Sequence, residues 1–182
     1  MSDAGIILYL NSLTGVSFYL DAFFYFVAKF VPYFMVAGIG YFLLRNFKQY
    51  LFFVTEVGLA VLFARYGIVN IIRYYFPRQR PFLQMEEVNL LLDYKEKPSF
   101  PSGHTALVFA IATVVYFYNK KIGIALYGLS LLVALSRVVV GMHWVSDVFA
   151  GAVAGVLAGV IVSEVFVLIK KEGRKERGRK DK

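Results

Sequence analysis

Residues 136–147 place an arginine, a histidine and an aspartate within an otherwise apolar part of the chain. His143 and Asp147 are four residues apart, so on a helix they would share one face and the carboxylate would orient the imidazole. Arg137 lies one residue after an apolar run, where a guanidinium is costly unless it meets an anion or a carboxylate. These residues predict an anion-handling site with a nucleophile or general base. The alternative is that they are interfacial residues at a membrane boundary.

Two further polar clusters precede this one in the chain. Arg73 and Arg80 are seven residues apart on a segment that contains prolines, and residues 101–104 read Pro-Ser-Gly-His where an apolar helix is expected to begin. The free N–H groups and the dipole of a helix start favour a bound phosphate. The chain has two histidines, and both lie in the polar clusters, at His104 and His143. The three clusters together predict a phosphate site with two imidazoles.

The clusters resemble the signature of the type 2 phosphatidic acid phosphatases (PAP2), a family that shares its site with the vanadium haloperoxidases. That signature reads Lys-x6-Arg-Pro, then Pro-Ser-Gly-His, then Ser-Arg-x5-His-x3-Asp. The second and third parts match here at every position, namely Pro101, Ser102, Gly103, His104, Ser136, Arg137, His143 and Asp147. The first part matches at Arg80 and Pro81, but Arg73 stands in place of its lysine. A planar guanidinium therefore replaces a compact ammonium at that position.

The resemblance implies a metal-independent reaction. It implies that His143 attacks phosphorus and becomes a phosphohistidine, that Asp147 orients it, and that His104 protonates the leaving group. The implied phosphate ligands are Arg73, Arg80, Ser102, the amide of Gly103, and Arg137. Water would then release inorganic phosphate. Pro81, Pro101 and Ser136 flank these ligands, and Arg65, two helical turns before Arg73, would extend the basic pocket.

Composition sets the class of protein. Of the 182 residues, 59% are hydrophobic, and the mean hydropathy is +0.62, which excludes an ordinary soluble domain and indicates an integral membrane protein. The chain has no cysteine, so it has no disulfide, thiolate nucleophile or cysteine metal site. No His-Glu-x-x-His pattern is present, and we predict neither a metal nor another cofactor.

The apolar pattern predicts an all-α, polytopic membrane bundle of five to six transmembrane helices in residues 1–169, followed by a basic tail at 170–182. A short interfacial helix is expected at 6–11. Residues 16–44 form one span or two, and the further spans are expected at 50–72, 105–118, 122–140 and 148–169. Glycines at four-residue spacing in the last span, Gly151, Gly155 and Gly159, predict close helix packing within one chain. Residues 85–94 are either an amphipathic cover or a solvated loop.

Loop charges predict the orientation. Lysines and arginines in residues 45–48, 120–121 and 170–182 fall on one side if each stretch crosses once, and the positive-inside rule assigns that side to the cytoplasm. The three polar clusters then face the opposite, extracytoplasmic side, which is the periplasm in a Gram-negative cell. Beside a membrane span, the tail is expected to meet anionic lipid heads rather than nucleic acid.

A phosphate site at the bilayer edge predicts a lipid phosphate as the substrate, with its tails in the hydrocarbon. The candidates are undecaprenyl diphosphate, phosphatidic acid, phosphatidylglycerol phosphate and a lipid A phosphate. The small size and the absence of extra domains resemble the bacterial undecaprenyl-diphosphate phosphatases, and a pocket with three or four arginines suits a diphosphate. The alternatives are a lipid phosphotransferase and a small membrane transporter, while the lipid setting disfavours a haloperoxidase. Oligomeric state is not predicted.

Overall fold

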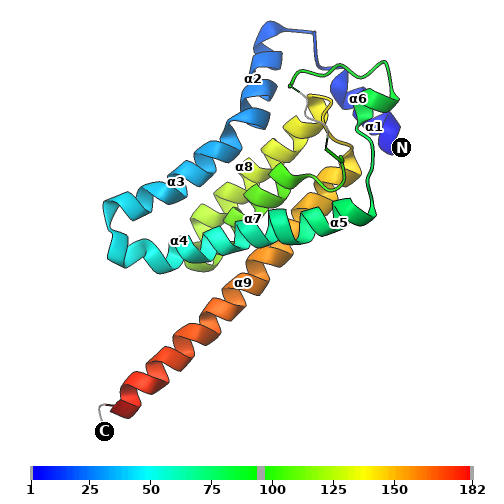
Figure 1. Ribbon diagram of the computed structural model, residues 1–182. Helices are drawn as coiled ribbons and strands as arrows, with labels where there is room; N and C mark the ends of the chain where they lie inside the picture. The colour runs from blue at the N-terminus through cyan, green and yellow to red at the C-terminus, as the bar shows by residue number, and fades with distance from the viewer. Residues whose placement is uncertain (1, 94–96, 181–182) are drawn as a thin grey trace.

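The computed structural model describes residues 2–93 and 97–180, and every regular element within these ranges is helical (Figure 1). The elements are α1 (Asp3–Asn11), α2 (Phe18–Lys29), α3 (Val31–Arg45), α4 (Phe47–Leu62), the π-helix η1 (Phe63–Val69), α5 (Asn70–Tyr75), α6 (Pro81–Gln84), α7 (Gly103–Tyr118), α8 (Lys120–Val139) and α9 (Val145–Lys180). The predicted all-α fold is confirmed for this part of the chain.

Helix α7 forms the centre of the bundle, between α8 and α9 (Figure 1). Residues 105–115 of α7 are buried at nearly every position, as expected of a helix that is apolar all round. The glycine repeat of α9 faces it. A β-carbon at Gly151 would lie 2.5 Å from the Ser102 carbonyl oxygen, and one at Gly155 would lie 2.4 Å from that of Ala106. The predicted packing of these glycines within one chain is therefore confirmed.

The described residues offer three or four candidate membrane spans, and the exact count of five to six stays a prediction. In the described part of the chain, three helices are long and apolar enough to cross a bilayer, namely Phe47–Tyr75, Lys120–Val139 and Val145–Gly173. The pair α2 and α3, bent by 45°, adds a fourth if it forms one span. Helix α7 has 16 residues, or about 24 Å against the roughly 30 Å of a hydrocarbon core. The prediction of five to six spans counted α7, which is shorter than that core.

The N-terminal helix is observed as α1, which begins three residues earlier than predicted because the Ser2 side chain caps it by accepting from the Gly5 amide. Ile7 is fully buried, so α1 packs onto the bundle. At its end, the Asn11 side-chain amide donates to the carbonyl oxygens of Asn89 and Val139, both at 2.8 Å. These hydrogen bonds fix the end of α1 to the loop before α7 and to the last residue of α8.

The connection between α6 and α7 is a loop rather than an amphipathic helix. Val88 and Leu92 are buried, and the Leu91 amide donates to the Val140 carbonyl at 3.2 Å. Gly141 has φ +77°, and a β-carbon there would lie 2.4 Å from the Asn89 carbonyl oxygen. The loop therefore covers the end of α8, as a cover without helical structure. Tyr94, the last residue of the predicted 85–94 segment, lies outside the described residues.

The basic tail continues α9. This helix runs without a break from Val145 to Lys180, and residues 181–182 of the predicted tail lie outside the described ranges. The C-terminal end of α9 projects from the bundle at the end remote from α1, α5 and α6 (Figure 1). The molecule therefore has a polar end, where α1, α5 and α6 lie, and a basic end, where α9 projects.

The close contact of α7 and α9 predicts a selective loss of stability. Gly155→Ala places a methyl group 2.4 Å from the Ala106 oxygen and 2.8 Å from the Phe109 β-carbon, and overpacking of this kind costs about 1–3 kcal/mol. We expect its thermal unfolding in detergent to shift to lower temperature. Gly128→Ala is the matched control, because a β-carbon there meets nothing within 4 Å. Equal unfolding temperatures for the two variants would contradict the packing described above.

Candidate active site

The three polar clusters meet at the polar end of the bundle. Arg73 lies on α5 and Arg80 immediately before α6, the Pro-Ser-Gly-His segment enters α7, and residues 136–147 run from the end of α8 into α9. Backbone hydrogen bonds join the clusters: the Ser102 amide donates to the Asp147 carbonyl at 2.9 Å. Arg80 Nη1 donates to the Met142 carbonyl at 2.8 Å. Residues separated widely in the chain are therefore fixed at one place.

His143 and Asp147 form a buried pair. Their side chains are 1% and 0% exposed, and Nδ1 lies 3.4 Å from the carboxylate Oδ2. The same oxygen accepts from the Trp144 amide at 2.9 Å and from the Ser99 hydroxyl. An ionised carboxylate only accepts hydrogen bonds, so this pairing requires the proton of a neutral ring on Nδ1. Nε2 then carries the lone pair and accepts from Arg80 Nη1, 3.4 Å away.

The environment of His143 favours the neutral ring. Burial lowers the pKa of His143 well below its ordinary value, and the charges of Arg137, Arg80 and Arg73 lower the pKa further. Both effects disfavour an imidazolium. The ring is therefore neutral at physiological pH, with an unprotonated nitrogen directed toward the arginines. This is the state that a nitrogen nucleophile requires.

Backbone carbonyls accept hydrogen bonds from Arg73 and Arg137. Arg73 donates through Nε and Nη2 to the Pro101 carbonyl, at 3.2 and 2.9 Å, and Arg137 Nη1 donates to the Ala28 carbonyl at 3.3 Å. Arg137 is 6% exposed, and its Nε has no hydrogen-bond partner within the described part of the chain. A buried guanidinium with an unused donor is strongly favourable for an oxyanion.

Arg65 lies beside the start of α7. An added β-carbon on Gly103 would lie 3.8 Å from Arg65 Nη1 and equally far from Arg73 Nη2. Both arginines line a cavity of about 450 Å³ that Gly103 and Lys97 also line. Arg65 sits on η1, and single π-helical turns occur frequently at functional sites. The structure thus places a fourth guanidinium against the helix start.

His104 is the second residue of α7. The charged and titratable groups that act on its ring are Arg137, Arg65, His143 and Arg73. His104 therefore lies within electrostatic reach of three of the arginines and of His143. Within the described ranges, no group of three or more His, Asp or Glu side chains could hold a metal ion.

The remaining motif residues lie at the starts of α6 and α7 and near the end of α8, at the same end of the bundle. Ser102 is buried, and its hydroxyl accepts from the Thr105 hydroxyl at 3.0 Å. Pro81 is buried at the first position of α6, while the Pro101 carbonyl holds Arg73 as described above. The Ser136 hydroxyl donates to the Leu132 carbonyl at 2.7 Å within α8. Ser136 is thus engaged inside its own helix.

Two residues outside the motifs, Ser99 and Arg78, contact the Asp147 carboxylate, and a third, Asp3, pairs with Arg78. Ser99 donates to Asp147, with its hydroxyl also 3.3 Å from His143 Nδ1. Arg78 Nη1 lies 3.1 Å from Asp147 Oδ1, and Arg78 Nη2 lies 2.9 Å from Asp3 Oδ2. The guanidinium of Arg78 also stacks on the Trp144 ring, 4.6 Å from its centroid. Arg78 therefore links α1, the catalytic carboxylate candidate and the loop before α9.

Asp3 is ionised in this arrangement. Burial alone would raise its pKa, but hydrogen bonds from Ser146 and Arg78 outweigh this effect and lower the pKa of Asp3. The position of Arg78 between Arg73 and Arg80 was a local signal for a role in the site. Asp3 and Ser99 offered no such signal, because neither belongs to a motif.

The arrangement can therefore hold a phosphoryl group. Guanidiniums and a helix start supply positive charge for its oxygens, a neutral imidazole supplies a nucleophile, and a second imidazole is available as an acid. This is the chemistry of metal-independent phosphate ester cleavage.

Known proteins share this pattern. Residues 49–170 match the PAP2 superfamily. The chain is 32% identical over 155 residues to a protein of Bacillus licheniformis named bacitracin transport permease protein BcrC, covering 85% of this chain and 75% of the relative. It is 32% identical over 114 residues to undecaprenyl-diphosphatase BcrC of Bacillus subtilis, covering 63% of this chain and 56% of the relative. The crystal structure of Aquifex aeolicus LpxE is similar with a TM-score of 0.71 and 30% identity, covering 88% of this chain and 93% of that one.

The unused donor of Arg137 predicts how the site binds an anion. Arg137→Gln removes a buried charge-assisted interaction, and we expect it to weaken the binding of inorganic phosphate to the purified protein by at least about tenfold. Titration followed by ³¹P nuclear magnetic resonance would measure this change. Arg45→Gln is the control, since Arg45 is exposed at the end of α3. Unchanged phosphate binding by Arg137→Gln would exclude Arg137 as a ligand.

Proposed function

The chain belongs to the PAP2 superfamily and is a membrane lipid phosphatase, and from this membership we propose that it hydrolyses undecaprenyl diphosphate at the extracytoplasmic membrane face through a phosphohistidine on His143. The observation that supports the proposal is the buried pair of His143 and Asp147, whose Nε2 lies 3.4 Å from Arg80 Nη1 in a site where Arg137 Nε has no hydrogen-bond partner among the described residues.

The first step is attack by His143 Nε2 on the terminal phosphorus. The P–N bond forms as the P–O bond to the leaving lipid phosphate breaks, while Asp147 stabilises the proton on Nδ1 and the charge that develops on the ring. The phosphate oxygens are held by Arg73, Arg80 and Arg137, with Ser102 and the Gly103 amide at the helix start. Positive charge at these oxygens stabilises the transition state without reorganisation.

His104 is the acid for the leaving oxygen. It lies in the field of the same arginines, and a bound phosphate offsets their charge, so the substrate itself favours protonated His104. After the lipid phosphate leaves, His104 accepts a proton from water, whose oxygen attacks the phosphohistidine. Inorganic phosphate leaves, and His143 returns to its neutral form. The cycle needs the residues of this chain and water.

A diphosphate matches the number of guanidiniums. Arg65 and Arg73 lie together beside Gly103 and line the adjoining cavity of about 450 Å³. Arg80 and Arg137 lie nearer to His143, as the charges acting on that ring indicate. One phosphoryl group would occupy the volume beside His143 and the second would face Arg65. The related undecaprenyl-diphosphatase of Bacillus subtilis supports the same substrate.

The orientation follows from the two ends of the molecule. Basic residues at Arg45, Lys48, Lys120 and Lys121, together with the tail from Lys170, lie at the ends of helices remote from the site. The positive-inside rule assigns that end to the cytoplasm. The site then opens extracytoplasmically, at the depth where a lipid diphosphate head lies while its tail stays in the hydrocarbon.

A panel of lipid phosphates tests the substrate. Purified protein is assayed for phosphate release from undecaprenyl diphosphate, phosphatidic acid, phosphatidylglycerol phosphate and lipid A, with a chelator present. We expect the highest kcat/KM for undecaprenyl diphosphate, and His143→Ala to lose at least about a thousandfold in kcat while its unfolding temperature is retained. A higher kcat/KM for another lipid would identify that lipid as the preferred substrate instead. Transfer of phosphate to a second lipid would indicate a phosphotransferase. Appreciable hydrolysis by His143→Ala would remove its role as nucleophile.

The contacts of Arg78 with Asp147 and Asp3 predict that loss of Arg78 lowers kcat rather than the affinity for substrate. Arg78→Gln removes the ion pair to Asp147 Oδ1 and the contact with Trp144, so the carboxylate is held against His143 only by the Trp144 amide and the Ser99 hydroxyl. We expect kcat to fall by about ten- to a hundredfold with KM nearly unchanged, because Arg78 acts through Asp147. Asp3→Asn should produce a smaller loss of the same kind. A rise in KM at constant kcat would show instead that Arg78 binds substrate.

A further inference from the structure

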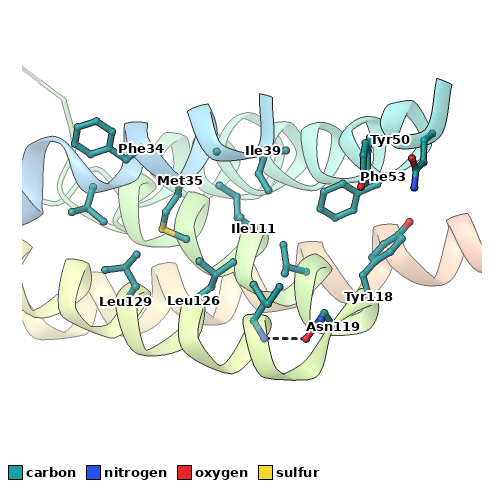
Figure 2. A pocket seen from close by; sticks show the side chains of 15 residues that line it. Phe34, Met35, Ile39, Tyr50, Phe53, Ile111, Tyr118, Asn119, Leu126 and Leu129 are labelled. Carbon is teal, nitrogen blue, oxygen red and sulfur yellow. Dashed lines mark hydrogen bonds between the residues drawn. The ribbon is translucent and has the colours of Figure 1, made fainter. Parts of the chain in front are cut away.

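A second cavity, of about 730 Å³, lies between α3, α4, α7 and α8. Figure 2 shows its apolar body, to which Met35, Ile39 and Ile111 contribute. Tyr118, which also lines it, is fourteen residues beyond His104 on α7, or about 21 Å along the helix. This groove therefore reaches the basic end of the bundle, away from the phosphate site.

The two ends of the groove differ in polarity. Figure 2 shows Tyr50 and Tyr118 near one end, and Phe34 and Leu129 at the other. Asn119 and Gln49 also belong to the lining, and they adjoin the two tyrosines in the chain. A groove with a polar mouth and an apolar body matches an amphiphile with one polar head.

The tyrosine at the mouth is fixed by a buried acid. Tyr118 donates to Glu56 Oε2 at 2.6 Å, and Ser163 donates to Glu56 Oε1 at 2.8 Å. Lys170 Nζ donates to the Tyr118 hydroxyl at 3.2 Å and lies 4.5 Å from the centroid of the Phe52 ring. Glu56 is 3% exposed, so its charge is used inside the bundle. The ammonium of Lys170 is left at the rim.

Further cations lie next to the mouth. Lys48 precedes Gln49, and Lys120 and Lys121 follow Asn119. All three lysines are exposed. Together with Lys170, these lysines adjoin lining residues of the mouth in the chain or by contact, and the described lining contains no acid. The complementary head group is an anion.

The length of the groove matches one leaflet. Its lining runs from Ile122 to Leu129 on α8 and from Val31 to Ile39 on α3, which is about 10–12 Å along each helix. Half of a hydrocarbon core is about 15 Å. A membrane helix is a poorer occupant, because helix pairs pack through small residues and bulky side chains such as Phe34 and Phe53 line this groove.

We propose that the groove binds one anionic phospholipid from the leaflet at the basic end of the molecule. One acyl chain lies between α3 and α8, and the head group lies among Lys48, Lys120, Lys121 and Lys170. This lipid is separate from the substrate, because the groove opens at the opposite end of α7 from His104. The proposal is independent of the substrate proposed above.

Gly38 provides a sharp test. It lines the groove, and a β-carbon there meets nothing within 4 Å, so Gly38→Leu fills the groove without a clash at its β-carbon. Gly40→Leu is the matched control: it lies on the same helix and is equally free of contacts at its β-carbon, but it is not part of the lining. Purified variants in detergent are titrated with dioleoylphosphatidylglycerol or dioleoylphosphatidylcholine, and bound lipid is measured by native mass spectrometry.

We expect the unaltered protein and Gly40→Leu to retain one phosphatidylglycerol, and Gly38→Leu to bind it at least about tenfold more weakly. Lys120→Gln and Lys121→Gln should each weaken phosphatidylglycerol about fivefold and leave phosphatidylcholine unaffected. Hydrolysis of a short-chain lipid phosphate by all variants verifies that they are folded.

Three results would overturn the proposal. The first is equal retention of phosphatidylglycerol by Gly38→Leu and Gly40→Leu. The second is equal binding of phosphatidylcholine and phosphatidylglycerol by the unaltered protein, which would show that no anionic head is recognised. The third is a higher KM of Gly38→Leu for a long-chain lipid phosphate with an unchanged KM for a short-chain one, which would show that the groove holds the substrate tail.

Discussion

Burial of positive charge is the constraint on which the site depends. Arg73 and Arg137 donate to backbone carbonyls, which satisfy donors but neutralise no charge, and Arg80 donates to the Met142 carbonyl. Asp147 is already engaged by Arg78, Ser99 and the Trp144 amide. The positive charge that remains is costly in an apolar bundle, and a phosphate group relieves that cost. The same field disfavours a charged His143, so the charges that we propose bind the substrate would also prepare the proposed nucleophile.

Close packing of α7 and α9 fixes the relative positions of the charged residues. The glycines of α9 let it approach the backbone of α7, which carries His104, and the Ser102 amide donates to the Asp147 carbonyl where the two helices begin. The acid candidate and the carboxylate are thereby held on two helices whose separation is fixed by backbone contact. Helices α1 and α6 and the loop before α7 close the polar end around them, so the site is supported by elements from nearly the whole chain.

The two ends of the bundle handle lipid differently. At the polar end, guanidiniums near a helix start are suited to a phosphoryl group that must bind, react and leave. At the basic end, flexible lysines surround an apolar groove and are suited to a head group that only needs a complementary charge. The buried Glu56 belongs to the second end, where Tyr118 and Ser163 satisfy it. Glu56, a charged residue inside a span, therefore fixes neighbouring side chains and lies away from the candidate active site.

The sequence by itself determined the helical class, the membrane setting and the residue types that meet in the site, because apolar runs and motif spacing are local properties. It did not fix the number of spans, since α7, with 16 residues, is buried among other helices and hydropathy does not distinguish this burial from contact with lipid. Only the tertiary structure joined Asp3 to Ser146, 143 residues away, and brought Arg78 and Ser99 onto Asp147. Such contacts depend on how helices pack, and no pattern within a single stretch of chain records them.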